Sequence, residues 1–147
     1  MKLSINTSIQ IQKPIEKVFE AIVNPAHMCQ YFIVRSSGMM EEDKELIWHF
    51  PEFEQPVPIR VGPIIENTFI SFYWTVGENE KVVEIKLEKR PDNSSVVYVT
   101  EKEGNQDEAG IHWLKGNTEG WANFLACLKA YLDHGINLRK GAFEYRF

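Results

Sequence analysis

Residues 119–135, EGWANFLACLKAYLDHG, decide the fold. At 3.6 residues per turn, the apolar side chains of this region fall within an arc of about 100°. The stripe consists of Leu114, Trp121, Phe124, Leu125, Leu128 and Leu132. Gly135 stands where a glycine ends a helix, and His134 lies in the last turn, where positive charge is favoured. We therefore predict a long amphipathic C-terminal helix, which begins either after Gly116 or at about Glu108.

Before this helix the sequence predicts strands, because apolar and polar residues alternate with a period of two. The alternation covers residues 3–11, 46–50, 57–65, 68–75, 83–87 and 95–99. Short turns join the last five of these segments, which is typical of an antiparallel meander. Pro58, Gly62 and Pro63 predict that the segment 57–65 is bulged or lies at an edge.

Residues 14–32 predict two short helices, because Pro14 and Pro25 each suit the first turn of a helix. A polar loop follows. The expected order is one strand, two short helices, five strands and one long helix, which is an α+β fold in a single domain. A sheet of six antiparallel strands has one apolar face to bury, and only one predicted helix is long enough to cover that face. The sheet must therefore curl around that helix and leave a gap that side chains or a ligand fill.

Four segments together resemble a known family: KPIEKVFEAIVNPAHMCQYF at 13–32, LIWHF at 46–50, FISFYW at 69–74 and EGWANFLACLKAYLDHG at 119–135. They are similar to the START-like (SRPBCC, helix-grip, Bet v 1-like) superfamily and, within it, to the domain of the activator of Hsp90 ATPase homologue, Aha1. The resemblance implies a curved antiparallel sheet of about six strands wrapped on the C-terminal helix. It covers residues 1–135, and we assign 136–147 to a C-terminal extension.

Composition excludes several classes of partner. The formal net charge is −5, and an acidic chain is a poor nucleic-acid binder because phosphate neutralisation drives that binding. No apolar run approaches the ~20 residues that span a bilayer, and the N-terminus lacks the apolar core of a signal peptide. We expect a cytoplasmic protein in which the two cysteines, Cys29 and Cys127, are reduced packing residues.

Catalytic and metal-binding patterns are missing from the sequence. None of the four histidines lies in a known catalytic or metal-ligand motif. The acidic residues Glu101, Glu103, Asp107 and Glu108 are interpreted as charges that complement the N-terminus of the last helix. We therefore expect no catalytic residue, no metal site and no cofactor.

A set of large apolar residues is expected to converge between the sheet and the last helix. These candidate ligand-cavity residues are Phe32, Trp48, Phe50, Phe72, Trp74, Val83, Trp113, Trp121 and Phe124. They form either a dense aromatic core or the floor of a pocket for a flat, hydrophobic molecule. Residue identity does not distinguish the two, because it does not encode cavity volume.

The leading functional hypothesis is a non-enzymatic protein that binds a hydrophobic small molecule in this cavity. The resemblance leaves two alternatives: an Hsp90-related co-chaperone or interaction module, and an enzyme of the polyketide cyclase or aromatase type. The resemblance implies a separate N-terminal domain for Hsp90 contact in the eukaryotic co-chaperone, and we expect this protein to lack such a domain. We therefore expect no Hsp90 stimulation by this chain alone.

The extension also carries a pattern. Phe143, Tyr145 and Phe147 alternate with polar or small residues, which is strand periodicity. We expect the extension to be ordered and to pack its aromatic face on the sheet or on a second subunit, the latter as a homodimer.

Overall fold

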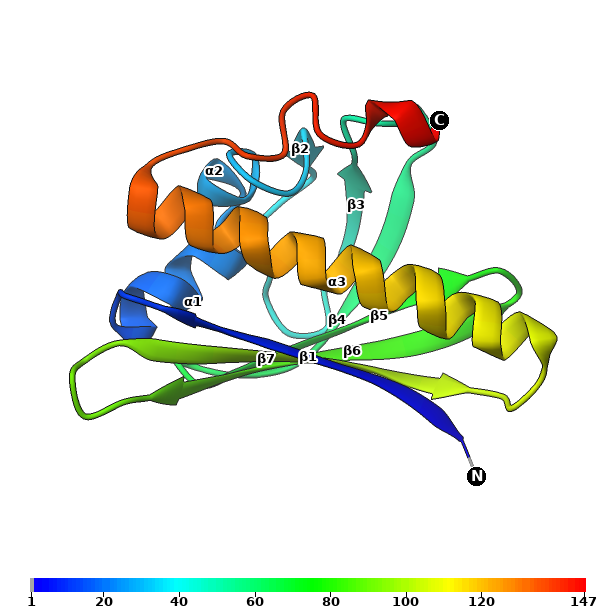
Figure 1. The fold of residues 1–147 in the computed structure, drawn as a ribbon, viewed down its shortest axis with the longest axis horizontal. Coiled ribbons are helices and arrows are strands. Elements are labelled where there is room, and N and C mark those ends of the chain that lie inside the picture. The colour runs from blue at the N-terminus through cyan, green and yellow to red at the C-terminus, as the bar shows by residue number, and fades with distance from the viewer. Residues whose placement is uncertain (1) are drawn as a thin grey trace.

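The computed structural model describes residues 2–147, leaving aside the side chain of Glu103. The strands are β1 (Leu3–Ile11), β2 (Arg35–Ser36), β3 (Glu45–His49), β4 (Val57–Ile65), β5 (Phe69–Val76), β6 (Asn79–Lys89) and β7 (Ser95–Gly104). The helices are α1 (Ile15–Val23), α2 (Pro25–Met28), α3 (Glu108–His134) and the single 3-10 turn η1 (Glu144–Arg146). This α+β order confirms the predicted succession of elements (Figure 1).

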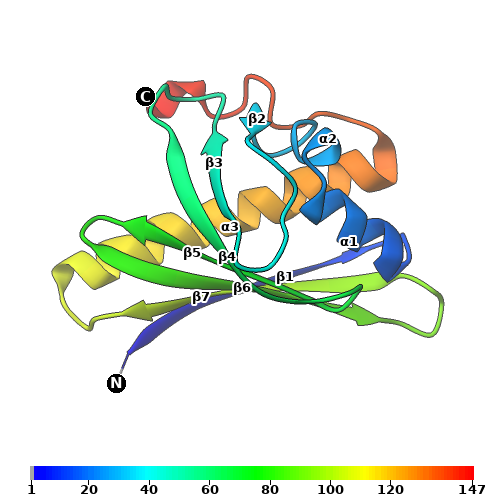
Figure 2. The same cartoon turned by 180° about the vertical axis from the view of Figure 1, so that it is seen from behind.

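The strands form one antiparallel sheet in the order β1-β7-β6-β5-β4-β3-β2. The sheet curves around α3, which crosses its concave face, as the two opposite views show (Figures 1 and 2). The helix-grip architecture is thus confirmed, with seven strands where about six were expected. The additional strand, β2, has only two residues, Arg35 and Ser36, which pair with His49 and Trp48. So short a strand leaves no period-two pattern in the sequence.

The proline-rich strand β4 illustrates how the local sequence shapes the sheet. Its register against β5 shifts between Val61 and Ile64, around Gly62 and Pro63. The predicted bulge is therefore confirmed. The edge position is not, because β4 lies between β3 and β5. A bulge increases the local bend of a strand, and β4 rises out of the plane of β5 and β6 (Figure 2).

The long helix begins at the earlier of the two predicted starts. Asp107 caps it, since its carboxylate accepts a hydrogen bond from the Gly110 backbone N–H at 2.7 Å. Gly135 ends it with φ +65°, in the left-handed conformation that glycine adopts without strain. The helix therefore runs through Gly116 and Gly120.

The predicted strand in the C-terminal extension is wrong. Residues 136–147 form an irregular segment that ends in η1, crosses above α2 and β2 and finishes beside the β3–β4 connection (Figure 1). Phe143 packs against the core, whereas Tyr145 and Phe147 are 79% and 71% exposed. Side-chain ion pairs, from Arg139 to Glu52 and from Arg146 to Glu119, connect this segment to the body of the protein. Backbone pairing with the sheet plays no part.

Within the described residues, no helix is both long and apolar enough to cross a membrane.

Candidate functional site

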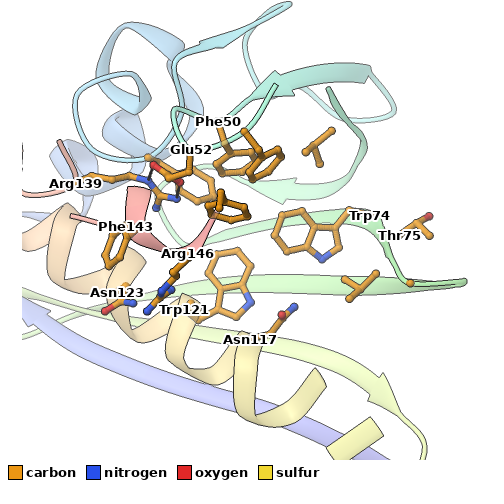
Figure 3. A pocket seen from close by; sticks show the side chains of 17 residues that line it. Phe50, Glu52, Trp74, Thr75, Asn117, Trp121, Asn123, Arg139, Phe143 and Arg146 are labelled. Atoms are coloured by element: carbon orange, nitrogen blue, oxygen red, sulfur yellow. Dashed lines mark hydrogen bonds and ion pairs between the residues drawn. The ribbon is translucent and has the colours of Figure 1, made fainter. Parts of the chain in front are cut away.

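A cavity of about 450 Å³ lies between the curved sheet, the middle of α3 and the C-terminal segment (Figure 3). Its volume is in the range of small-molecule sites. The lining residues come from four regions: Phe32 after α2; Phe50, Glu52, Phe53, Val57, Trp74, Thr75, Val76 and Gly77 from β3 to the β5–β6 turn; Asn117, Gly120, Trp121 and Asn123 from α3; and Arg139, Phe143, Arg146 and Phe147 from the C-terminal segment. Most of these side chains are apolar, and many are aromatic.

Two indoles form one wall of the cavity. Trp74 on β5 and Trp121 on α3 have their ring centroids 5.5 Å apart, with 34° between the ring planes. Trp121 is nearly fully buried, and Trp74 is half-buried and faces the cavity. Phe32 and Phe50 meet edge to face at 5.1 Å and continue the aromatic lining. Such packing is favourable for aromatic rings and also suits an aromatic ligand.

A fully buried carboxyl group, that of Glu101 on β7, holds this wall in place. Its Oε2 accepts a hydrogen bond from Trp74 Nε1 at 2.6 Å. Its Oε1 accepts from Trp121 Nε1 at 3.0 Å and from Asn117 Nδ2 at 2.9 Å. Because a buried polar group is costly without partners, these three bonds fix both indoles and the amide relative to one another. Glu101 thereby sets the shape of the cavity from behind its lining.

The sequence interpretation of Glu101 as a charge near a helix N-terminus is wrong. Glu101 lies within β7 and points into the grip, opposite Val83 of β6 and Ile5 of β1. The signal was present: Ser95, Val97 and Val99 define the inward face of this strand, and Glu101 continues the same alternation. A period-two pattern places it inside, whatever its charge.

The C-terminal segment closes one side of the cavity with two ion pairs of different kinds. Arg139 donates two hydrogen bonds to Glu52, at 2.5 and 3.2 Å, and both side chains are largely buried. Arg146 pairs with Glu119 on α3, whose side chain is 63% exposed. The Phe147 ring lies 5.2 Å from the Phe53 ring. Sequence analysis singled out Phe147 through its aromatic alternation. It did not select Glu52, Phe53, Glu119, Arg139 or Arg146, because their contacts join distant segments.

Four of the nine candidate cavity residues line the cavity, three pack behind that lining, and two lie elsewhere. Phe32, Phe50, Trp74 and Trp121 line the cavity. Trp48, Phe72 and Phe124 pack directly behind them, in ring contacts such as Trp48 to Phe72 at 5.1 Å and Phe32 to Phe124 at 4.7 Å.

Val83 and Trp113 lie apart from the cavity. Val83 is buried in the sheet opposite Phe72. Trp113 is buried near the start of α3, where the Lys81 ammonium lies 4.6 Å from its ring centroid.

The histidines and the cysteines lie outside the cavity lining. His27 shares a hydrogen bond of 2.6 Å with the Tyr131 hydroxyl, and no histidine lines the cavity. Burial raises the pKa of the Cys127 thiol and of the Cys29 thiol, which disfavours a reactive thiolate. Among the described side chains, no group of three or more His, Cys, Asp and Glu residues could hold a metal ion.

A curved antiparallel sheet that grips one long helix around an internal cavity defines the START-like class of proteins. Within that class, the chain belongs to the family of activator of Hsp90 ATPase homolog 1-like proteins, whose sequence profile matches residues 12–133. A comparison with functionally curated proteins finds no match.

Solved structures support the same assignment. Protein SSP2350 from Staphylococcus saprophyticus is 31% identical, with a TM-score of 0.82 over 93% of this chain and 96% of that chain. The Aha1 dimer from Colwellia psychrerythraea is 20% identical, with a TM-score of 0.76 over 90% of this chain and 98% of that chain. DynU16, a putative protein in the dynemicin biosynthetic locus, is 18% identical, with a TM-score of 0.80 over 90% of this chain and 48% of that chain. The last two likenesses concern the fold alone.

Proposed function

We propose that this protein is a non-enzymatic binding protein for a hydrophobic small molecule held between the sheet and α3. One observation carries the proposal: the cavity wall of Trp74 and Trp121 is fixed by three hydrogen bonds to Glu101. A pre-organised wall lowers the ordering cost of binding. In this proposal residues 1–135 form the binding domain, and 136–147 form an extension that closes one side of its cavity.

The character of the lining favours binding over catalysis. Among the described lining residues, Glu52 supplies the only carboxylate, and this carboxylate already forms an ion pair with Arg139. The other buried carboxyl group, Glu101, accepts hydrogen bonds from two indoles that stand between it and a bound molecule. A general acid or base needs direct reach to its substrate, or reach through one water, and neither group is so placed.

Gly120 allows a direct test. It lines the cavity on α3, and a Cβ added there meets nothing within 4 Å. Gly116 is one helical turn earlier, has equally open surroundings and lies outside the lining. Leucine favours helix at both positions, so Gly120→Leu and Gly116→Leu are a matched pair in which only the first narrows the cavity.

The probe is N-phenylnaphthylamine, an uncharged aromatic amine that fluoresces in apolar surroundings, titrated into each variant. We expect saturable binding to the wild type and to Gly116→Leu, and a loss of about tenfold or more in Gly120→Leu, because the added side chain occupies the site. Equal binding by all three proteins, or binding by none, contradicts the proposal.

A further inference from the structure

We infer that the ligand of this cavity is an aromatic molecule that carries a single acidic group, whose oxygens are bound by Arg146. The inference rests on the proposed function and specifies its ligand. The charged residues of the lining are Arg139, Arg146 and Glu52, while Glu101 and Glu119 lie directly beside it. Because Arg139 is paired with the lining carboxylate Glu52, Arg146 is the lining cation that an acidic group on a ligand would meet.

The two arginines are not equivalent. Arg139 has a side chain only 14% exposed and donates two hydrogen bonds to Glu52, which is 3% exposed. Separating such a pair leaves a buried charge without a partner, which is strongly destabilising. Arg139 is therefore a fixed part of the structure and does not recognise a ligand.

Arg146, in contrast, can exchange its partner. Its side chain is 30% exposed, and its carboxylate partner Glu119 is 63% exposed on the outer side of α3. Exposed ion pairs contribute little, because water solvates each charge almost as well. An acidic group that enters the cavity can thus replace Glu119, which returns to water at little cost.

The other polar groups define the orientation of the ligand. Asn123, one turn beyond Glu119 on α3, lines the same part of the cavity and supplies an amide donor near Arg146 (Figure 3). Glu101 lies at the opposite end, behind Trp74, Trp121 and Asn117. A ligand acid is repelled by Glu101 and attracted by Arg146. Its ring system therefore lies on the indole wall, with the acid toward the C-terminal segment.

The test uses two probes that share an aromatic skeleton and differ in one acidic group: anilinonaphthalene sulfonate and the uncharged N-phenylnaphthylamine. We expect the wild type to bind the sulfonate about five- to tenfold more tightly at low salt, because a charge-assisted hydrogen bond replaces a weak exposed pair. Arg146→Gln is expected to remove this preference by weakening only the sulfonate. Glu119→Gln is expected to strengthen sulfonate binding, because it frees Arg146.

Matched controls come from another exposed ion pair, Arg60 with Glu80, which is outside the cavity lining. Arg60→Gln and Glu80→Gln change the net charge by the same amounts and are expected to leave both affinities within about twofold. Equal binding of the two probes, or equal effects of Arg146→Gln and Arg60→Gln, overturns the acid preference and leaves the cavity function standing. If neither probe binds, the proposed function fails as well.

Discussion

Two buried tryptophans of α3 have opposite surroundings. Trp113 and Trp121 are 7% and 3% exposed, and both belong to the core. Trp113 packs so closely on β7 that a Cβ at Gly104 would lie 2.2 Å from its ring. Trp121 instead borders an open cavity and donates its indole N–H to Glu101. The buried N–H of Trp113 has no hydrogen-bond partner in the part of the chain that the structure describes.

The difference shows that a large side chain borders a cavity only where the residues on the opposite strand hold the backbone away from it. Opposite Trp113, Gly104 allows the strand and the indole to approach until no space remains. Opposite Trp121, Trp74 and Glu101 keep the sheet and the helix apart. One end of the space between sheet and helix is therefore packed core, and the middle holds the cavity.

The largest expected effect is the difference in stability lost when each tryptophan is truncated to alanine. We expect Trp113→Ala to destabilise the protein by about 3–5 kcal/mol, because a closely packed side chain is lost and a void remains. Trp74→Ala on the cavity wall is expected to lower the stability by roughly 1–3 kcal/mol, since a ring that borders a cavity already lacks neighbours on one side. Urea unfolding of both variants measures the difference.

The binding of N-phenylnaphthylamine completes this comparison. Trp74→Ala should alter it, whereas a folded Trp113→Ala should retain it. Equal losses of stability in the two variants would mean that Trp74 is ordinary core and would remove the argument for a pre-formed cavity.

The sequence predicted the grip and could not predict this division. Trp121 belongs to the apolar stripe of α3 and Trp113 lies beside that stripe, and both were expected to line the cavity. The helical period did not separate them, because it reports the direction of a side chain and not its distance from the sheet. That Gly104 faces one of them, and Glu101 the other, depends on how β7 pairs and twists against its neighbours. These contacts depend on the tertiary structure, and local periodicity carries no information about them.

The C-terminal segment was harder still to predict. Its alternation of aromatic residues favoured a strand, but the Arg139–Glu52 and Arg146–Glu119 ion pairs determine its path. Each pair joins residues far apart in the sequence, so the pattern of neighbouring residues gave no information about them. By contrast, the inward position of Glu101 followed from the alternation of β7 and was overlooked because of its charge.

Glu101 holds the cavity wall, so its substitution is expected to loosen both indoles. In Glu101→Gln one acceptor oxygen becomes an N–H₂ donor, so at least one of the three donors from Trp74, Trp121 and Asn117 loses its partner. A buried donor left without a partner costs about 1–3 kcal/mol, and we expect a loss of stability of that size. Looser indoles should also weaken binding of N-phenylnaphthylamine.

Tryptophan fluorescence tests the same point independently, because released indole N–H groups change the emission of Trp74 and Trp121. The matched control is Glu84→Gln on the neighbouring strand, where the carboxylate pairs with Lys102 at a partly exposed position. If Glu101→Gln behaves like this control in stability, emission and probe binding, Glu101 does not organise the wall.

The smallest expected effects come from Gly116 and Gly120 in α3, and Gly110 in the same helix provides the contrast of a closely packed position. At Gly110 an added Cβ would lie 1.7 Å from the Asn105 carbonyl oxygen, so Gly110→Ala should destabilise the protein by forcing the helix start away from its cap. At Gly116 and Gly120 the added methyl group meets nothing within 4 Å, so alanine should raise the stability by up to about 1 kcal/mol through its helix propensity alone. Thermal unfolding of the three variants measures these signs. A destabilising Gly120→Ala would mean that the space beside Trp121 is already filled, and the cavity would then be part of the core.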